Sequence, residues 1–303
     1  MTFRSGFACF VGRPNAGKST LTNALVGHKV AITSGRPQTT RHTVRGIVHR
    51  DDAQLILVDT PGLHRPRTLL GERLNALVRD TLTEVDVVGF CLPSDQKVGP
   101  GDRFIAEQLH ELAQGPGKTP VVAIATKADL VGKQRLAEHL LAISQLGDWA
   151  DIVPVSAESG YQVDVLENVL VSHLTEGPAL YPEGELTDEP VAVMVAELVR
   201  EAALEGVRDE LPHSLAVVVD EMLPREGSTD ERPMLDVRVN LFVERDSQKA
   251  IVIGKGGSRL REVGTQARHG IEALLGTRVF LDLHVKVAKD WQRDPKQLGR
   301  LGF

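Results

Sequence analysis

The sequence predicts an α/β unit with a mostly parallel sheet and helices on both faces, followed by a smaller α+β unit. Short apolar runs alternate with amphipathic stretches through the first 175 residues, an order typical of a parallel sheet covered by helices. The order changes after a segment near residue 180 that is rich in proline, glycine and acids. A length of 303 residues, about twice that of a typical domain, agrees with two units.

The elements of the first unit follow from these apolar and amphipathic runs. The expected strands are 7–11, 54–58, 85–91, 120–126 and 152–155, and the expected helices are 18–26, 68–83, 102–114, 133–145 and 163–173. Residues 42–49 are expected to add an antiparallel edge strand beside 54–58, through a turn at Asp51 and Asp52.

The second unit begins after residues 176–190, which hold three prolines, two glycines and five acids. We therefore expect a first domain at 1–177, a linker at 178–190 and a second domain with a C-terminal tail at 191–303. The second domain should contain a helix at 192–205, strands at 214–221 and 235–244, two helices around a glycine-rich turn, and a strand at 278–287.

The charge is divided unevenly along the chain. The formal net charge is -6, but residues 249–303 hold 11 Lys or Arg and 5 Asp or Glu, a net of +6 that leaves -12 for residues 1–248. A content of 42% hydrophobic and 25% charged residues excludes collagen-like, disordered and disulfide-scaffold chains. Cys9 and Cys91 lie in apolar runs and should be buried thiols, and no metal-ligand pattern includes them. No run of about 18 apolar residues occurs, so we expect a cytoplasmic protein.

A phosphate-binding loop is predicted where the first strand meets the first helix. Glycines there let backbone N–H groups surround phosphate, Lys18 supplies a cation to the β and γ oxygens, and the Ser19 hydroxyl suits Mg²⁺. The alternative is a glycine-rich turn with an incidental lysine. The motif G-x-x-x-x-G-K-[ST] is formed by Gly12, Arg13, Pro14, Asn15, Ala16, Gly17, Lys18 and Ser19, and Thr20 follows it.

Three further motifs follow expected strands in the order of a guanine-nucleotide site. Asp59-Thr60-Pro61-Gly62 can hold Mg²⁺ through water at Asp59 and offer the Gly62 N–H to a γ-phosphate, although a plain turn is the alternative. Thr126-Lys127-Ala128-Asp129 carries a carboxylate that can accept from guanine N1 and N2, a donor pair that adenine lacks. Ser156-Ala157-Glu158-Ser159-Gly160 should complete the pocket with a backbone N–H to guanine O6, and Ser156 and Ala157 are its expected binding residues.

With these motifs the chain resembles the translation-factor-class GTPases, and within them the Era-like family that assists bacterial ribosome assembly. The resemblance implies that 37–42 is the first switch, where a threonine binds Mg²⁺ when γ-phosphate is present; Thr40 is the preferred ligand and Thr39 the alternative. The catalytic set is then Lys18, Thr40, Asp59 and Gly62. The family usually has Asn where this chain has Thr126, which weakens binding but leaves guanine specificity with Asp129.

Two positions bear on the rate of hydrolysis. Leu63 stands where Ras-like enzymes place a water-orienting glutamine, so intrinsic hydrolysis should be slow. Related GTPases with Asn at the position of Asn15 use K⁺ beside the phosphates, so the resemblance implies faster hydrolysis in K⁺ than in Na⁺.

The second unit carries a G-x-x-G turn between two helices, in the element order of a type II KH domain. Its glycines allow close approach of a nucleic-acid backbone, and the basic side chains suit phosphate. A plain helix–helix turn is the alternative. The expected RNA-binding residues are Ile253, Gly254, Lys255, Gly256, Gly257, Arg259, Arg261 and Arg268.

The family resemblance extends through 210–214, 264–268 and 298–303. It implies binding of the single-stranded 3′ end of 16S ribosomal RNA and assistance to 30S subunit assembly. Trp291 is either a base-stacking residue or, as we prefer, a buried anchor of the tail.

The main prediction is therefore a GTP-hydrolysing switch with Mg²⁺ as cofactor and GTP and GDP as substrate and product. The alternative is a non-catalytic RNA-binding scaffold in which nucleotide is structural. A monomer is expected, and peripheral association with the inner face of the cell membrane is left open, as are the RNA bases read and the mode of nucleotide exchange.

Overall fold

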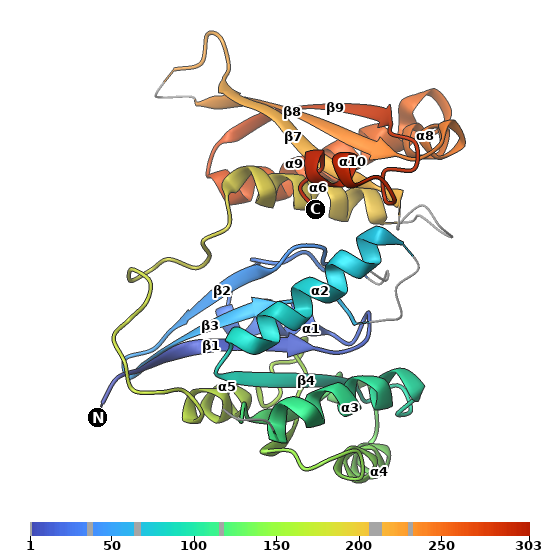
Figure 1. Cartoon of the computed structure of the whole chain (residues 1–303). Helices are drawn as coiled ribbons and strands as arrows, with labels where there is room; N and C mark the ends of the chain where they lie inside the picture. The colour runs from blue at the N-terminus through green and yellow to red at the C-terminus, as the bar shows by residue number, and fades with distance from the viewer. Residues whose placement is uncertain (1, 35–38, 64–67, 115–117, 206–213, 230–232) are drawn as a thin grey trace. The chain divides into compact units, whose positions relative to one another are not determined.

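The computed structural model describes residues 2–34, 39–63, 68–114, 118–205, 214–229 and 233–303, and the chain forms two compact units (Figure 1). The first consists chiefly of residues up to Asp188 and the second chiefly of residues from Glu189. Within the described residues, no helix is both long and apolar enough to cross a membrane.

The first unit is built on a sheet whose described strands lie in the order β2-β3-β1-β4-β5-β6. Neighbouring strands are parallel except that β2 runs antiparallel to β3, with Val44 opposite Asp59. This confirms the predicted mostly parallel sheet and its antiparallel edge strand. The strands are β1 Arg4–Val11, β2 Val44–His49, β3 Ala53–Asp59, β4 Val87–Pro93, β5 Val121–Thr126 and β6 Asp151–Pro154.

Helices cover both faces of this sheet. Successive side chains on a strand point to opposite sides, and because both sides are apolar, each needs a layer of helices to bury it. Along β1, Ala8 and Phe10 pack in one cluster with α1 and α5, whereas Cys9 and Val11 pack in another with α2, α3 and α4. Both cysteines are free and buried, as predicted, and burial raises the pKa of Cys91 to about 12. The helices are α1 Lys18–Val26, α2 Leu69–Glu84, α3 Pro100–Gln114, α4 Lys133–Ser144 and α5 Val163–Ser172.

The segment 178–188, part of the predicted linker, lies along the β2 side of the first unit. Gln54 Oε1 accepts hydrogen bonds from the backbone N–H groups of Leu180 (2.7 Å) and Tyr181 (2.9 Å). The N–H of Ile47 donates to the carbonyl of Leu186 at 2.9 Å. Its proline and acid content predicted a linker but gave no sign of this docking. The limits 177 and 191 stay predictions.

The second unit is a small α+β domain. It contains a three-stranded sheet, and helices α6 and α9 pack against one face of that sheet. Strand β8 lies between β7, which is antiparallel to it, and β9, which is parallel to it. Apolar side chains from α6, α9 and the odd-numbered positions of β8 and β9 form its core. The elements are α6 Val191–Leu204, β7 Ala216–Pro224, β8 Met234–Val243, α8 Asp246–Ile253, α9 Ser258–Leu275, β9 Arg278–Val287 and α10 Pro295–Arg300.

The C-terminal tail is anchored by Trp291, which is fully buried. Its indole Nε1–H donates to the carbonyl of Ser214 at 3.0 Å, and its ring stacks on Phe303 with centroids 5.5 Å apart. The anchor interpretation is therefore confirmed, and burial excludes base stacking. The short helix α10, which the sequence analysis missed, begins at Pro295 after Asp294, whose carboxylate accepts from the N–H of Lys296.

Candidate functional site

The phosphate-loop motif connects β1 to α1 at the carboxyl edge of the sheet. Asn15 and Gly17 have left-handed backbone conformations, with φ 62° and 87°, which turn successive N–H groups toward one side. A Cβ at Gly12 would lie 2.7 Å from the carbonyl oxygen of Cys91, so only glycine fits there. The loop thus has the close-packed, concave backbone that an anionic phosphate requires.

Lys18 lies buried at the start of α1, with 6% of its surface exposed. Its Nζ is 3.3 Å from the carbonyl oxygen of Arg13 and donates a hydrogen bond to it. Burial lowers the pKa of Lys18, and the nearby charge of Asp59 opposes that shift. A cation held inside the loop in this way is placed to meet phosphate oxygens.

Three oxygen-bearing side chains meet beside the loop. Ser19 Oγ donates to Asp59 Oδ2 at 2.6 Å and lies 2.9 Å from Thr40 Oγ1, and Thr40 Oγ1 donates to Asp59 Oδ2 at 3.2 Å. Asp59 is fully buried, and its Oδ1 has no hydrogen-bond partner among the described residues. Burial raises the pKa of this carboxyl, with Lys18 opposing the shift.

Oxygen donors of this kind fit Mg²⁺, which favours carboxylate and hydroxyl ligands together with water and phosphate. Thr40 is the member of the threonine pair that joins the cluster, as preferred in the sequence analysis. Pro37 and Gln38 of the same motif lie outside the described residues. The ligand roles themselves stay predictions.

The Asp-x-x-Gly turn packs directly against the phosphate loop. A Cβ at Gly62 would lie 2.9 Å from the backbone nitrogen of Pro14, so a side chain has no room there. The N–H of Leu63 donates to the carbonyl of Gly12 at 3.2 Å, and its side chain is 4% exposed within the core. Leu63 therefore contacts the phosphate loop through its backbone N–H, while its side chain packs in the core.

A cavity of about 190 Å³ brings the base-binding motifs together. Thr126 Oγ1 donates to the carbonyl of Ala16 at 2.7 Å, which ties this motif to the phosphate loop. Asp129 lines the cavity and is exposed. Glu158, which belongs to the predicted Ser156–Gly160 motif, also lines it. Leu130 and Val155 line it too and were not predicted, although each adjoins a recognised motif. The predicted residues in its lining are Gly17, Thr20, Thr126, Lys127, Asp129, Ser156 and Ala157.

The G-x-x-G turn of the second unit joins α8 to α9. Gly254, Gly256 and Gly257 all have left-handed φ values of 71°, 60° and 75°. A Cβ at Gly254 would lie 3.0 Å from the backbone nitrogen of Arg259, whereas one at Gly257 would meet nothing within 4 Å. Lys255 at the tip is exposed. The turn thus presents bare backbone and one cation to solvent, as a phosphate-binding turn requires.

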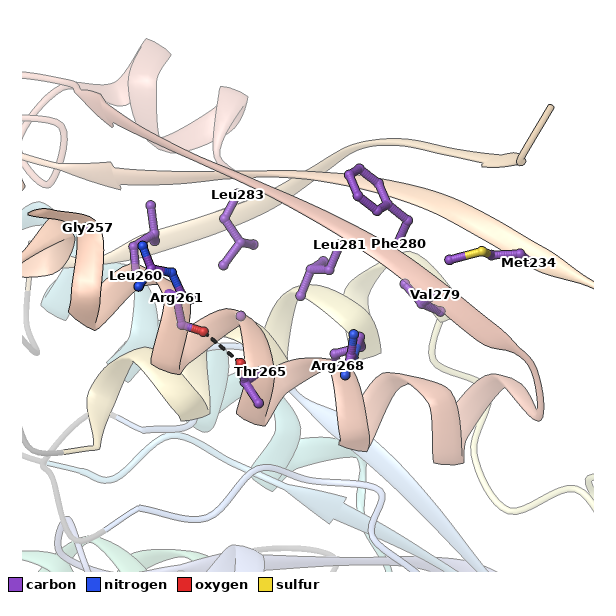
Figure 2. A pocket seen from close by; sticks show the side chains of 11 residues that line it. Met234, Gly257, Leu260, Arg261, Thr265, Arg268, Val279, Phe280, Leu281 and Leu283 are labelled. Carbon is purple, nitrogen blue, oxygen red and sulfur yellow. Dashed lines mark hydrogen bonds between the residues drawn. The ribbon is translucent and has the colours of Figure 1, made fainter. Parts of the chain in front are cut away.

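A groove of about 400 Å³ runs beside this turn between α9 and β9 (Figure 2). Arg261 and Arg268 line it, as predicted for RNA contacts. Ile253 packs against the core instead, and the guanidinium of Arg259 donates to the carbonyl of Glu205 just beyond α6, where exposed carbonyls attract a cation. Met234 and Phe280 also line the groove, and no sequence motif pointed to them.

The fold and these two sites define the class: a P-loop GTP-binding domain joined to a KH domain. Family models agree, since the 50S ribosome-binding GTPase family matches residues 7–127 and the KH domain family matches residues 210–292. The chain is 72% identical to the GTPase Era of Streptomyces coelicolor, covering 99% of this chain and 95% of that protein. It is 70% identical to the GTPase Era of Mycolicibacterium smegmatis, with 99% of each chain covered. This chain belongs to the Era family of GTPases.

Solved structures of relatives are similar over the whole chain. A crystal structure of Era with MgGDPNP and nucleotides 1506–1542 of 16S ribosomal RNA has a TM-score of 0.91 and 36% identity, with 99% of each chain covered. The same values hold for a variant of Era from Aquifex aeolicus bound to GDP·AlF4⁻.

Proposed function

We propose that this chain is a GTP-hydrolysing switch that binds the single-stranded 3′ end of 16S ribosomal RNA through its KH groove and assists 30S subunit assembly. The proposal rests on two features of one chain: a cavity lined by Thr126, Asp129 and Ser156 next to the phosphate loop, and a groove lined by Arg261 and Arg268 beside an exposed G-x-x-G turn. The complexes of its relatives with MgGDPNP, GDP·AlF4⁻ and 16S RNA support it.

In this proposal the phosphate loop binds the β-phosphate through its N–H groups, and Lys18 neutralises the β and γ oxygens. Ser19, Thr40 and Asp59, the last through water, would hold Mg²⁺, which when bound would stabilise negative charge on the phosphates. The Gly62 N–H donates to the γ-phosphate. Asp129 accepts from guanine N1 and N2, and this selects GTP over ATP.

The Leu63 side chain is buried and has no polar atom, so the attacking water would be oriented by backbone groups, a cation or a partner. Asn15 is placed in the loop with an amide oxygen that suits K⁺, and K⁺ there would offset charge that develops during hydrolysis. Intrinsic hydrolysis is accordingly slow and faster in K⁺.

The protein acts as a monomer in the cytoplasm on a 30S precursor, and a peripheral contact with the inner membrane face is compatible with this role. The switch loops around Thr40 and Gly62 would change order with nucleotide and so alter access to RNA.

Steady-state GTP hydrolysis in matched KCl and NaCl buffers tests the proposal, with Asn15→Ala as the variant. We expect about tenfold faster hydrolysis in KCl for the wild type and little difference between the salts for Asn15→Ala. Equal wild-type rates in both salts would refute the K⁺ site.

A scaffold that uses nucleotide only for structure is the second candidate, and the burial of Leu63 is the observation that favours it. A rate indistinguishable from buffer in both salts, together with tight GTP binding, would establish the scaffold and exclude the switch.

A further inference from the structure

We propose that Phe280 and Arg225 form a stacking platform for one nucleobase at the far end of the KH groove. The RNA would then be held at two places, by the glycine turn and by this platform. The inference rests on the proposed function, in that the groove must bind single-stranded RNA.

The length of the groove gives the first reason. Its lining runs from Gly257, the N-cap of α9, to Arg268, which is eleven residues further along and about 16 Å away on the helix axis. At its far end the lining passes to Met234 at the start of β8 and Phe280 on β9. Phe280 therefore lies well away from Lys255, where the turn would hold phosphate, and an RNA strand that follows the groove reaches it.

The position of Phe280 gives the second reason. Val279 and Leu281 point from β9 toward α9 and contribute to the core, whereas Phe280 projects from the opposite side of the strand (Figure 2). Its side chain is 48% exposed. An aromatic ring that is half in solvent at the end of a nucleic-acid groove offers a flat surface to a base, and stacking on such a ring accepts any base.

The third reason is that the ring is held by a cation. The Arg225 guanidinium carbon lies 4.3 Å from the centroid of Phe280, and Arg225 Nη1 is 3.2 Å from Asp236 Oδ1. The Arg225 N–H also donates to the carbonyl of Met234 at 2.9 Å, which fixes its backbone. The register places Asp236 directly opposite Phe280 on neighbouring strands.

This arrangement orders the ring before RNA arrives, so a base that stacks there finds a surface already in place. Arg268 lines the same groove, and its exposed guanidinium can meet phosphates near a stacked base.

The test measures the affinity of the full-length chain, with GDPNP and Mg²⁺ present, for nested oligoribonucleotides from the 3′ end of 16S ribosomal RNA. The variants are Phe280→Ala, the conservative Phe280→Tyr, and Arg225→Met. His284→Ala is the matched control, because His284 is exposed on the same face of β9 but does not line the groove. Lys255→Ala reports binding at the glycine turn independently.

For a 12-nucleotide RNA we expect Phe280→Ala to lose about tenfold in affinity, Arg225→Met about threefold, and Phe280→Tyr and His284→Ala less than twofold. For the shortest RNA whose binding still depends on Lys255, Phe280→Ala should match the wild type. A scan of abasic sites should find one position at which base removal weakens the wild type but not Phe280→Ala.

Equal loss at every RNA length, or no loss at any, would overturn the platform while leaving Lys255-dependent binding intact. A loss for Phe280→Tyr as large as for Phe280→Ala would also overturn it, because the ring is retained. If no RNA depended on Lys255, the proposed function itself would fail instead.

Discussion

The predicted nucleotide site and the KH groove differ in how their charged side chains would meet phosphate. In the first, Lys18 and Asp59 are buried, and Ser19 and Thr40 are hydrogen-bonded to the Asp59 carboxylate at 2.6 and 3.2 Å. In the second, Lys255 is exposed at the glycine turn, and Arg261 and Arg268 are exposed along the groove beside it. The first site depends on fixed geometry and the second on charge that many RNA conformations can meet.

This difference explains why the net charge of the whole chain is a poor guide to whether it binds RNA. A pocket with preorganised backbone dipoles and one buried cation needs no basic surface, so residues 1–248 can carry -12 and still bind a triphosphate. A groove that follows a flexible strand needs long-range attraction, and the +6 of residues 249–303 supplies it. Single substitutions should therefore cause large losses of ligand affinity at the first site and smaller losses at the second.

The largest effect is expected for Lys18→Ala. Removal of the buried cation leaves the phosphates without their closest charge, and GTP affinity should fall about 1,000-fold by isothermal titration. Lys133→Ala, which removes an exposed lysine at the start of α4, is the control and should leave it unchanged. RNA affinity of Lys18→Ala should stay within about threefold of the nucleotide-free wild type. A parallel collapse of RNA affinity would show that the two sites are not separable.

Asp129→Asn should come next, with about a 100-fold loss of GTP affinity and a gain for xanthosine triphosphate. The amide donates where the carboxylate accepted, so it repels the guanine N1–H and matches the extra oxygen of xanthine. Competition between the two nucleotides measures the change. An unaltered preference would mean that the 190 Å³ cavity is not the base site.

A smaller change is expected for Thr126→Val, about a tenfold loss of GTP affinity. Valine keeps the shape but leaves the buried Ala16 carbonyl without its 2.7 Å hydrogen bond. Thr126→Ser keeps the hydroxyl and should remain within about twofold of the wild type. If valine and serine behave alike in nucleotide titrations, the loop is not anchored through this bond.

The smallest expected effect is the difference in salt dependence between RNA affinity and GTP affinity. If three cationic side chains meet RNA phosphates, doubling KCl should lower RNA affinity about fourfold, and Lys255→Ala should make the dependence shallower. GTP affinity should change less than RNA affinity, because buried charges are weakly screened. A steeper dependence for GTP than for RNA would contradict this difference in screening between the two sites.

Local signals predicted most of the elements and motif positions. The phosphate loop could be placed because its glycines, lysine and flanking strand are contiguous in sequence, and the sheet then gathers the later motifs at one edge. The type II KH fold could likewise be predicted, because its helices and strands follow one another in a characteristic order along the sequence.

Features that depend on contacts between distant segments could not be predicted. The stacking of Arg225 on Phe280 requires the register of three strands, and the bond from Arg259 to the Glu205 carbonyl requires the packing of α9 near the end of α6. The docking of 178–188 along β2 depends on Gln54, more than 120 residues earlier. None of these has a local sequence pattern.

In the proposed function, this GTPase binds the 3′ end of 16S ribosomal RNA through its KH groove. The most direct test is to crosslink the chain to RNA in cells and to sequence the attached RNA. The comparison is with Gly254→Asp, in which the new side chain collides with Arg259 and repels phosphate. We predict reads concentrated at the 3′ end of 16S ribosomal RNA for the wild type and their loss in the variant, with GTP binding retained. Reads spread evenly over cellular RNA, or a 16S peak unchanged by Gly254→Asp, would contradict the account.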